Sequence, residues 1–165
     1  MKKSVEILFE ETKKEALNIG LPICTNLTLS VNNKPKKRFG RCTKLSDTNY
    51  HIEISGITLT GHEQGIKAII MHELIHTCKN CMNHGSNFKK YAELVNSKTN
   101  YGISRTSSMD SLGVDKNELR KNSKWLITCK DCGKEIYKQR TSGVIKYPKN
   151  YSCKCGGKLK VENLY

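Results

Sequence analysis

The chain has 165 residues and carries 29 Lys and Arg against 15 Asp and Glu, a formal net charge of +14. This length provides for one medium domain, or a small domain with an added module, and it suffices to bury a hydrophobic core. No stretch approaches the 18 consecutive apolar residues of a transmembrane helix, and Glu6, Glu10 and Glu11 interrupt any apolar run of a signal peptide. We therefore expect a cytoplasmic protein with no membrane segment, which could associate with the nucleoid.

The basic excess favours an anionic partner, with nucleic acid ahead of anionic lipid. Residues 114–165 carry 13 Lys and Arg against 5 Asp and Glu, a net charge of +8, so the tail is the more basic part. A lysine-rich composition without a nucleic-acid partner is the simpler alternative.

The first part of the chain predicts a helix followed by a small antiparallel sheet. Apolar residues recur at helical spacing in residues 3–18, and Gly20 interrupts that pattern. Residues 26–31 and 50–59 alternate apolar and polar side chains, which is typical of strands. We expect residues 32–42 to form a basic turn between them.

The second part predicts two more helices and then a linker. Residues 63–78 are strongly apolar with helical spacing, and residues 86–98 follow with Ser86 or Asn87 as a plausible N-cap. Residues 106–113 are small and polar, as in a linker.

The apolar helix carries the motif H-E-x-x-H at residues 72–76. Positions i and i+4 lie one turn apart on one face, so His72 and His76 can bind a single Zn²⁺ ion. Glu73 stands where a general base reaches a metal-bound water. This arrangement predicts metal-assisted hydrolysis, and it fixes the water chemistry better than the substrate.

A catalytic zinc ion usually takes three protein ligands and one water. His84 follows the helix after a short turn and is the favoured third ligand, with Glu93 on the next helix as an alternative. Cys78 and Cys81 form a C-x-x-C pair inside the turn. They could form a redox pair or close the site with thiolates, but we expect them to pack at the helix end and shape the turn.

Other candidate ligands have ordinary interpretations. Cys24 and Cys42 stand alone and are most simply small buried residues. His51 lies within an expected strand and His62 directly before a helix, so we expect both to be polar residues without a metal.

The tail contains two cysteine pairs, Cys129-x-x-Cys132 and Cys153-x-Cys155, each followed by glycine. Four thiolates on two tight turns predict a closed, tetrahedral, structural zinc site. Free thiols in a reducing compartment are the alternative.

The segment between the two pairs alternates like two short strands. It interleaves tyrosines with basic residues, which suits contact with a nucleic-acid backbone and stacking on bases. The candidate DNA contacts are Lys134, Lys138, Arg140, Lys146 and Lys149. Tyrosines that pack on the tail's own small core are the other interpretation.

These residues resemble the SprT-like, or Spartan-type, zinc metallopeptidases. The resemblance rests on "HELIH", on His84-Gly85, on "FKKYAELVN" and "YGISR", and on a C-terminal zinc ribbon. It implies that His72, His76 and His84 bind a catalytic zinc ion and that Glu73 is the base. The short connection from His76 to His84 departs from the Spartan branch.

The resemblance implies an α+β fold and a domain order. A zincin-like metallopeptidase domain, with an N-terminal helix, a small antiparallel sheet and a catalytic helix pair, is expected over residues 1–106. A linker over 107–124 and a small β zinc ribbon over 125–165 would follow.

The leading hypothesis is a zinc metalloendopeptidase with one catalytic and one structural Zn²⁺ ion. It would act near single- or double-stranded DNA on DNA-bound or DNA-crosslinked proteins, a substrate class that comes from the resemblance. The alternatives are a nucleic-acid-binding adaptor with two structural zinc sites, and a hydrolase with a non-peptide substrate.

Overall fold

The computed structural model describes residues 3–34, 38–107, 109–114, 116–121 and 123–165. The chain forms two compact units, Met1–Val114 and Asp115–Tyr165. Their boundary falls within the segment predicted as a linker, which also contains the short helices α4 (Met109–Leu112) and α5 (Lys116–Lys121). No helix in the described ranges is long and apolar enough to cross a membrane. The expected α+β class is confirmed.

The N-terminal unit begins with helix α1 (Val5–Ile19), close to the predicted range. The Ser4 hydroxyl caps its first turn by accepting from the Ile7 amide. Gly20 ends the helix in the left-handed region at φ 90°, where a side chain would be strained. One face of α1 is buried, with Leu8 and Ala16 fully covered.

The sheet of this unit is mixed, whereas the sequence predicted an antiparallel one. Its strands are β1 (Leu27–Asn32), β2 (Gly40–Lys44) and β3 (Tyr50–Ser55), in the order β1-β3-β2. β3 pairs in parallel with β1 and antiparallel with β2. The difference arises because β2 begins at Gly40, inside the segment 32–42 that was interpreted as a turn, so the return strand between β1 and β3 was missed.

Two other boundaries differ from the predictions. The strand expected over residues 50–59 ends at Ser55, and the chain continues as the 3-10 helix η1 (Gly56–Thr60). Residues 35–37 of the expected basic turn lie outside the described ranges.

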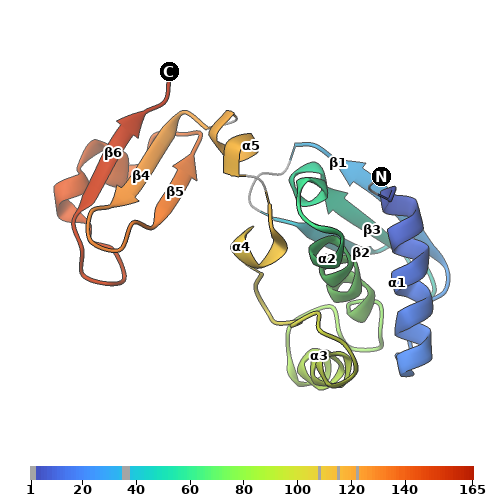
Figure 1. Ribbon diagram of the computed structural model, residues 1–165. Helices are drawn as coiled ribbons and strands as arrows, with labels where there is room; N and C mark the ends of the chain where they lie inside the picture. The colour runs from blue at the N-terminus through green and yellow to red at the C-terminus, as the bar shows by residue number, and fades with distance from the viewer. Residues whose placement is uncertain (1–2, 35–37, 108, 115, 122) are drawn as a thin grey trace. The chain divides into compact units, whose positions relative to one another are not determined.

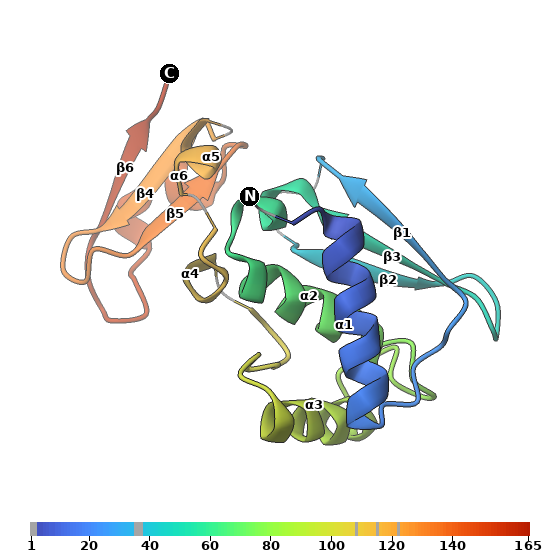
Figure 2. The same cartoon turned by 45° about the vertical axis from the view of Figure 1, so that its right-hand side comes forward.

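Helices α2 (Glu63–Ile75) and α3 (Ser86–Lys98) complete the unit. α1 and α2 lie side by side along one face of the sheet (Figures 1 and 2). Apolar side chains of α2 are buried on several sides because the sheet, α1 and α3 all contact it. Gly85 caps α3 without a side-chain hydrogen bond, in place of the expected Ser86 or Asn87.

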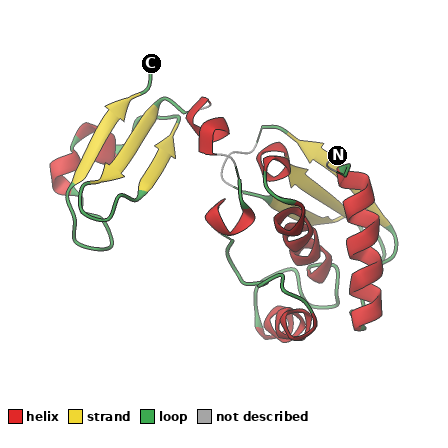
Figure 3. Cartoon of the chain, viewed as in Figure 1, coloured by secondary structure: helices red, strands yellow, loops and turns green. Residues whose placement is uncertain are grey.

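The C-terminal unit contains an antiparallel sheet of β4 (Trp125–Cys129), β5 (Glu135–Lys138) and β6 (Leu159–Asn163), in the order β5-β4-β6. Between the cysteine pairs the chain forms one strand, β5, and then helix α6 (Gly143–Lys146) and the 3-10 turn η2 (Pro148–Asn150) (Figure 3). The second strand predicted there is therefore wrong.

Candidate metal centre and catalytic site

The end of α2 and the turn before α3 bring three histidines together. The Nε2 atoms of His72 and His84 lie 2.9 Å apart, and those of His76 and His72 lie 3.3 Å apart. Three ligand nitrogens, one from each residue, lie within 4.8 Å of one another. Tetrahedral ligands at about 2.0–2.1 Å from one Zn²⁺ ion are separated by roughly 3.3 Å, so the histidine cluster fits such an ion.

The surroundings of the histidines fix their orientation. His76 directs Nδ1 at the Cys81 carbonyl oxygen, 2.6 Å away, which leaves Nε2 for the cluster. His72 bonds the backbone at Ser104. The buried Phe88 ring lies against all three imidazoles, with centroid distances of 4.7–4.8 Å. These contacts limit how far the three rings can turn.

Burial makes the imidazoles poor bases and keeps them neutral, as metal ligands must be. Desolvation, with added repulsion from His76 and His84, lowers the pKa of His72 to about 3. Desolvation also lowers the pKa of His76 and of His84. The charge of Arg105 acts on His84 in the same direction.

Cys78 and Cys81 shape the turn between the second and third histidines. Both side chains are buried, and desolvation raises the pKa of the Cys78 thiol to about 12. Asn80, between them, has a positive φ of 60°. Within the described ranges the cluster around His72 contains histidines without these thiols. Cys81 contacts His76 through its backbone carbonyl oxygen.

Glu73 is buried at the boundary between α2 and the edge strand β2. Its exposed fraction is 6%, and burial raises the pKa of its carboxyl to about 8. A hydrogen bond with the Cys42 backbone and the charge of Arg38 act in the opposite direction. A Cβ atom at Gly40 would lie 2.7 Å from Glu73 Oε1, so only glycine permits this approach. No sequence pattern predicted the contacts of β2 with Glu73.

The four tail cysteines form a second cluster. Cys129 and Cys155 Sγ atoms lie 3.6 Å apart, and those of Cys132 and Cys153 lie 3.7 Å apart. One sulfur from each of the four lies within 4.8 Å of the others. Zinc–sulfur bonds of about 2.3 Å in a tetrahedron separate the sulfurs by roughly 3.75 Å, so this cluster also fits the ion.

The titration of these thiols shows why a cation suits the cluster. Backbone hydrogen bonds at Cys132 and Asp131 lower the pKa of Cys129 to about 7. For Cys155 a backbone hydrogen bond at Gly157 favours the thiolate, but the three other sulfurs outweigh it and raise the pKa to about 12. Four thiolates cannot be this close without a positive charge among them.

The remaining candidates lie apart from the metal clusters. Glu93 is exposed on α3. His51 contacts the hydroxyls of Thr28 and Ser30 at 2.7 and 2.8 Å, and His62 caps α2 by accepting from the Gly65 amide at 2.8 Å. Cys24 and Cys42 are half-buried.

The basic residues of the tail are mostly exposed. Lys134, Arg140, Lys146 and Lys149 are exposed, whereas Lys138 is half-buried and reaches Ser142. Two tyrosines near them do not pack into a core: the exposed fraction is 63% for Tyr147 and 49% for Tyr151.

Comparison with protein families places most of the N-terminal unit in a known family. The model of the SprT-like family matches residues 8–107, a range that contains the three histidines and Glu73. A comparison with curated proteins found no match.

Proposed function

The chain belongs to the SprT-like family, and from this premise we propose that its N-terminal unit is a zinc-dependent endopeptidase. The observation that carries the proposal is the histidine cluster, whose spacing fits one Zn²⁺ ion, with Glu73 adjacent to the first ligand. Three nitrogen ligands leave a fourth position for water or substrate, which is typical of catalytic zinc sites.

We assign separate roles to the metal ion and to Glu73. When bound, the ion would polarise the scissile carbonyl and lower the pKa of a coordinated water. The Glu73 carboxylate takes a proton from the attacking water and delivers it to the leaving amine nitrogen. A nearby cation favours the ionised carboxylate, which counters the desolvation that raises the pKa of Glu73 in the metal-free site.

We further propose that the C-terminal unit holds a structural Zn²⁺ ion and contacts DNA. Its four cysteines fit the ion, and its net charge of +8 would attract phosphates. Exposed Tyr147 and Tyr151 provide faces on which unpaired bases could stack. Proteins bound or crosslinked to DNA are then the substrates that both units could reach together.

The experiment is cleavage of a basic DNA-binding protein by wild type and Glu73→Gln, without DNA, with duplex and with single strands. Glu73→Gln should retain the zinc of the histidine cluster and lose about 10²–10⁴-fold in rate, because it removes the general base. DNA should accelerate the wild-type reaction. Equal rates for the two proteins would contradict the role of Glu73, and equal rates with and without DNA would contradict the DNA-associated role alone.

A Co²⁺ spectrum tests the alternative of a closed, non-catalytic site. Co²⁺ bound by three histidines and water lacks the sulfur-to-metal charge-transfer bands that thiolate ligands produce. The protein in which all four tail cysteines are replaced by serine, so that no tail thiolate remains, should show no such bands. Strong thiolate bands there would favour the adaptor.

A further inference from the structure

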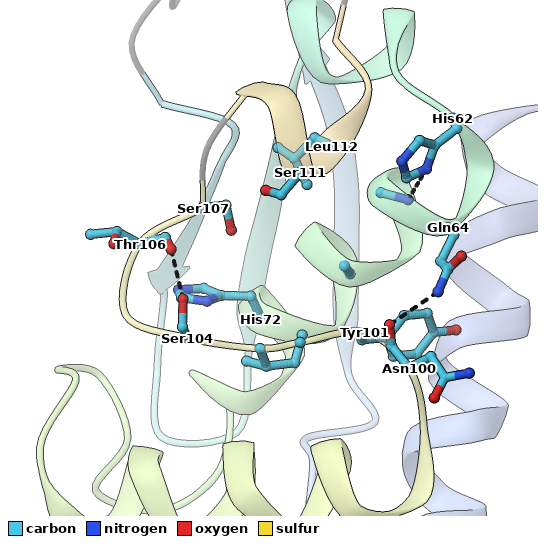
Figure 4. A pocket seen from close by; sticks show the side chains of 14 residues that line it. His62, Gln64, His72, Asn100, Tyr101, Ser104, Thr106, Ser107, Ser111 and Leu112 are labelled. Atoms are coloured by element: carbon cyan, nitrogen blue, oxygen red, sulfur yellow. Dashed lines mark hydrogen bonds between the residues drawn. The ribbon is translucent and has the colours of Figure 1, made fainter. Parts of the chain in front are cut away.

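A polar pocket of about 540 Å³ opens beside the histidine cluster. Its walls are the face of α2 that ends at His72, the segment that follows α3, and the end of α4 (Figure 4). His72 lines the pocket and also belongs to the cluster, so the pocket adjoins the metal centre at this residue.

Small residues on α2 create the pocket. Gly65 and Ala68 occupy the turns before His72 on one helix face, and both line the pocket. At Gly65 a Cβ atom would lie 2.6 Å from the Leu112 carbonyl oxygen, so glycine lets the end of α4 approach α2. The His62 amide donates to the same carbonyl at 3.2 Å, and Leu112 is buried. The end of α4 is thereby anchored as a wall.

The lining is rich in hydrogen-bonding groups. The segment after α3 contributes the hydroxyls of Ser104, Thr106 and Ser107, and α2 contributes the amide of Gln64. Ser104 donates to the Thr106 carbonyl at 2.6 Å, and Gln64 donates to the Asn100 carbonyl at 3.0 Å. These bonds hold the lining groups in place while their oxygens remain able to accept. Hydroxyl and amide groups can both donate and accept hydrogen bonds, so the pocket favours a ligand that does both.

We propose that this pocket binds an uncharged polar side chain of the substrate, of the amide or hydroxyl class, next to the scissile bond. The proposal rests on the proposed peptidase function and adds a substrate preference to it. An apolar side chain would leave the hydroxyls and the amide without their water, and a charged one would lose its hydration, so both bind less well than glutamine or asparagine.

The test uses binding, so that it does not depend on hydrolysis. The probes are short peptide hydroxamates, whose hydroxamate group chelates zinc, identical except for Gln, Leu, Glu or Lys at the adjoining side chain. Their dissociation constants are measured on zinc-loaded Glu73→Gln protein. We expect the Gln probe to bind about tenfold more tightly than the other three, the worth of one or two well-placed hydrogen bonds.

Two further variants, each combined with Glu73→Gln, assign the preference to the pocket. Ala68→Leu fills the space, and Ser107→Ala removes a hydroxyl without adding bulk. In Ala68→Leu the preference for the Gln probe should be less than about twofold. In Ser107→Ala that preference should be weaker than in the parent protein by a factor of about three. Zinc content and far-UV circular dichroism check folding, and Ser107→Ala keeps the proposal testable if Ala68→Leu does not fold.

The outcomes separate the two proposals. Equal, tight binding of all four probes would overturn the pocket preference and leave the peptidase proposal standing. A preference that persists in both variants would place its origin elsewhere and also overturn the pocket assignment. If no hydroxamate binds to protein with a full zinc complement, the site has no open position, and both proposals fail.

Discussion

At the scale of single residues, the environment of Glu73 decides what the site can do. Its carboxyl is buried against β2, where burial raises its pKa to about 8 and the backbone at Cys42 provides a hydrogen bond. A buried carboxyl without a cation prefers to be protonated, and a proton-carrying group cannot act as a base. In the mechanism that we propose, binding of the metal ion would therefore also ionise Glu73 and activate it as the base.

This coupling predicts a pH-dependent effect of Glu73→Gln on the stability of the metal-free protein. The pKa of Glu73 rises from 4.5 in the unfolded chain to about 8 in the folded one, so the folded state holds a proton that the unfolded state releases. The free energy of unfolding of wild type should therefore fall as pH rises from about 4.5 to 8. Glutamine has no such proton to lose.

We expect the free energy of unfolding of metal-free Glu73→Gln to equal that of wild type near pH 5. At pH 8 it should be greater by on the order of 2 kcal/mol. Urea unfolding of both proteins after chelation measures this difference. The titration of His72 is common to both and should largely cancel. A difference that stays constant between pH 5 and 8 would show that Glu73 titrates normally.

A second residue prediction concerns Gly40. An added Cβ would lie 2.7 Å from Glu73 Oε1 and 3.0 Å from Ile69 Cγ2, so Gly40→Ala should displace the carboxyl. We expect kcat to fall at least about tenfold while zinc content is unchanged, because Gly40 touches the base and not the ligands. Arg41→Ala, an exposed position on the same strand, is the matched control. Full activity of Gly40→Ala would mean that Glu73 tolerates displacement.

At the scale of elements, the Asn96 side chain fixes the part of the segment after α3 that contacts the histidine cluster. Asn96 donates from Nδ2 to the Ile103 carbonyl at 2.8 Å and accepts from the Ile103 amide at 2.6 Å. The next residue, Ser104, provides the backbone bond to His72. Asn96 is thus a positioning residue, which acts on the metal centre through the backbone of a neighbouring segment.

Loss of the two hydrogen bonds between Asn96 and Ile103 should weaken metal binding without unfolding α3. We expect Asn96→Ala to lower the zinc affinity of the histidine cluster about tenfold, in the range typical of groups that support metal ligands. Competition with a chromophoric chelator measures this affinity, in protein whose tail site is disabled by Cys129→Ser. Ser97→Ala is the control, because the Ser97 hydroxyl donates to the Leu94 carbonyl of its own helix. Equal zinc affinities of Asn96→Ala and Ser97→Ala would show that Asn96 does not support the metal centre.

The elements that the sequence predicted are those with a strong local pattern. α1, α2 and α3 have helical apolar spacing, and the cysteine pairs have glycine-containing turns, so their existence followed from neighbouring residues. β2 has five residues without alternating burial, and the parallel pairing of β1 with β3 joins segments about twenty residues apart. The contact of Gly40 with Glu73 depends on that tertiary arrangement, and the bonds of Asn96 to Ile103 depend on how the chain turns after α3, which no apolar spacing indicates.

At the scale of the whole molecule, the two units differ in how much core they bury. The N-terminal unit has a core drawn from three helices and a sheet. In the described part of the C-terminal unit the buried apolar side chains are few, chiefly Leu126, Ile127 and Ile145, with Cys129 of the cysteine cluster. A unit of about 50 residues with so small a core usually needs a metal or a disulfide to fold.

Cys129→Ser should therefore unfold the C-terminal unit and leave the N-terminal unit intact. Hydrogen exchange should show protection lost across β4, β5 and β6 and retained in α1 and α2. Cys24→Ser, which alters a half-buried thiol of the N-terminal unit, is the matched control.

The Cys129→Ser variant also tests the proposed DNA contact. A folded surface presents its lysines to the phosphates together, whereas an unfolded tail must be ordered first. We expect the DNA affinity at 150 mM salt to fall at least about tenfold and its logarithmic salt dependence to become shallower. If affinity and salt dependence match those of wild type, the phosphate contacts belong to the N-terminal unit, whose residues 1–113 carry a net charge of +6.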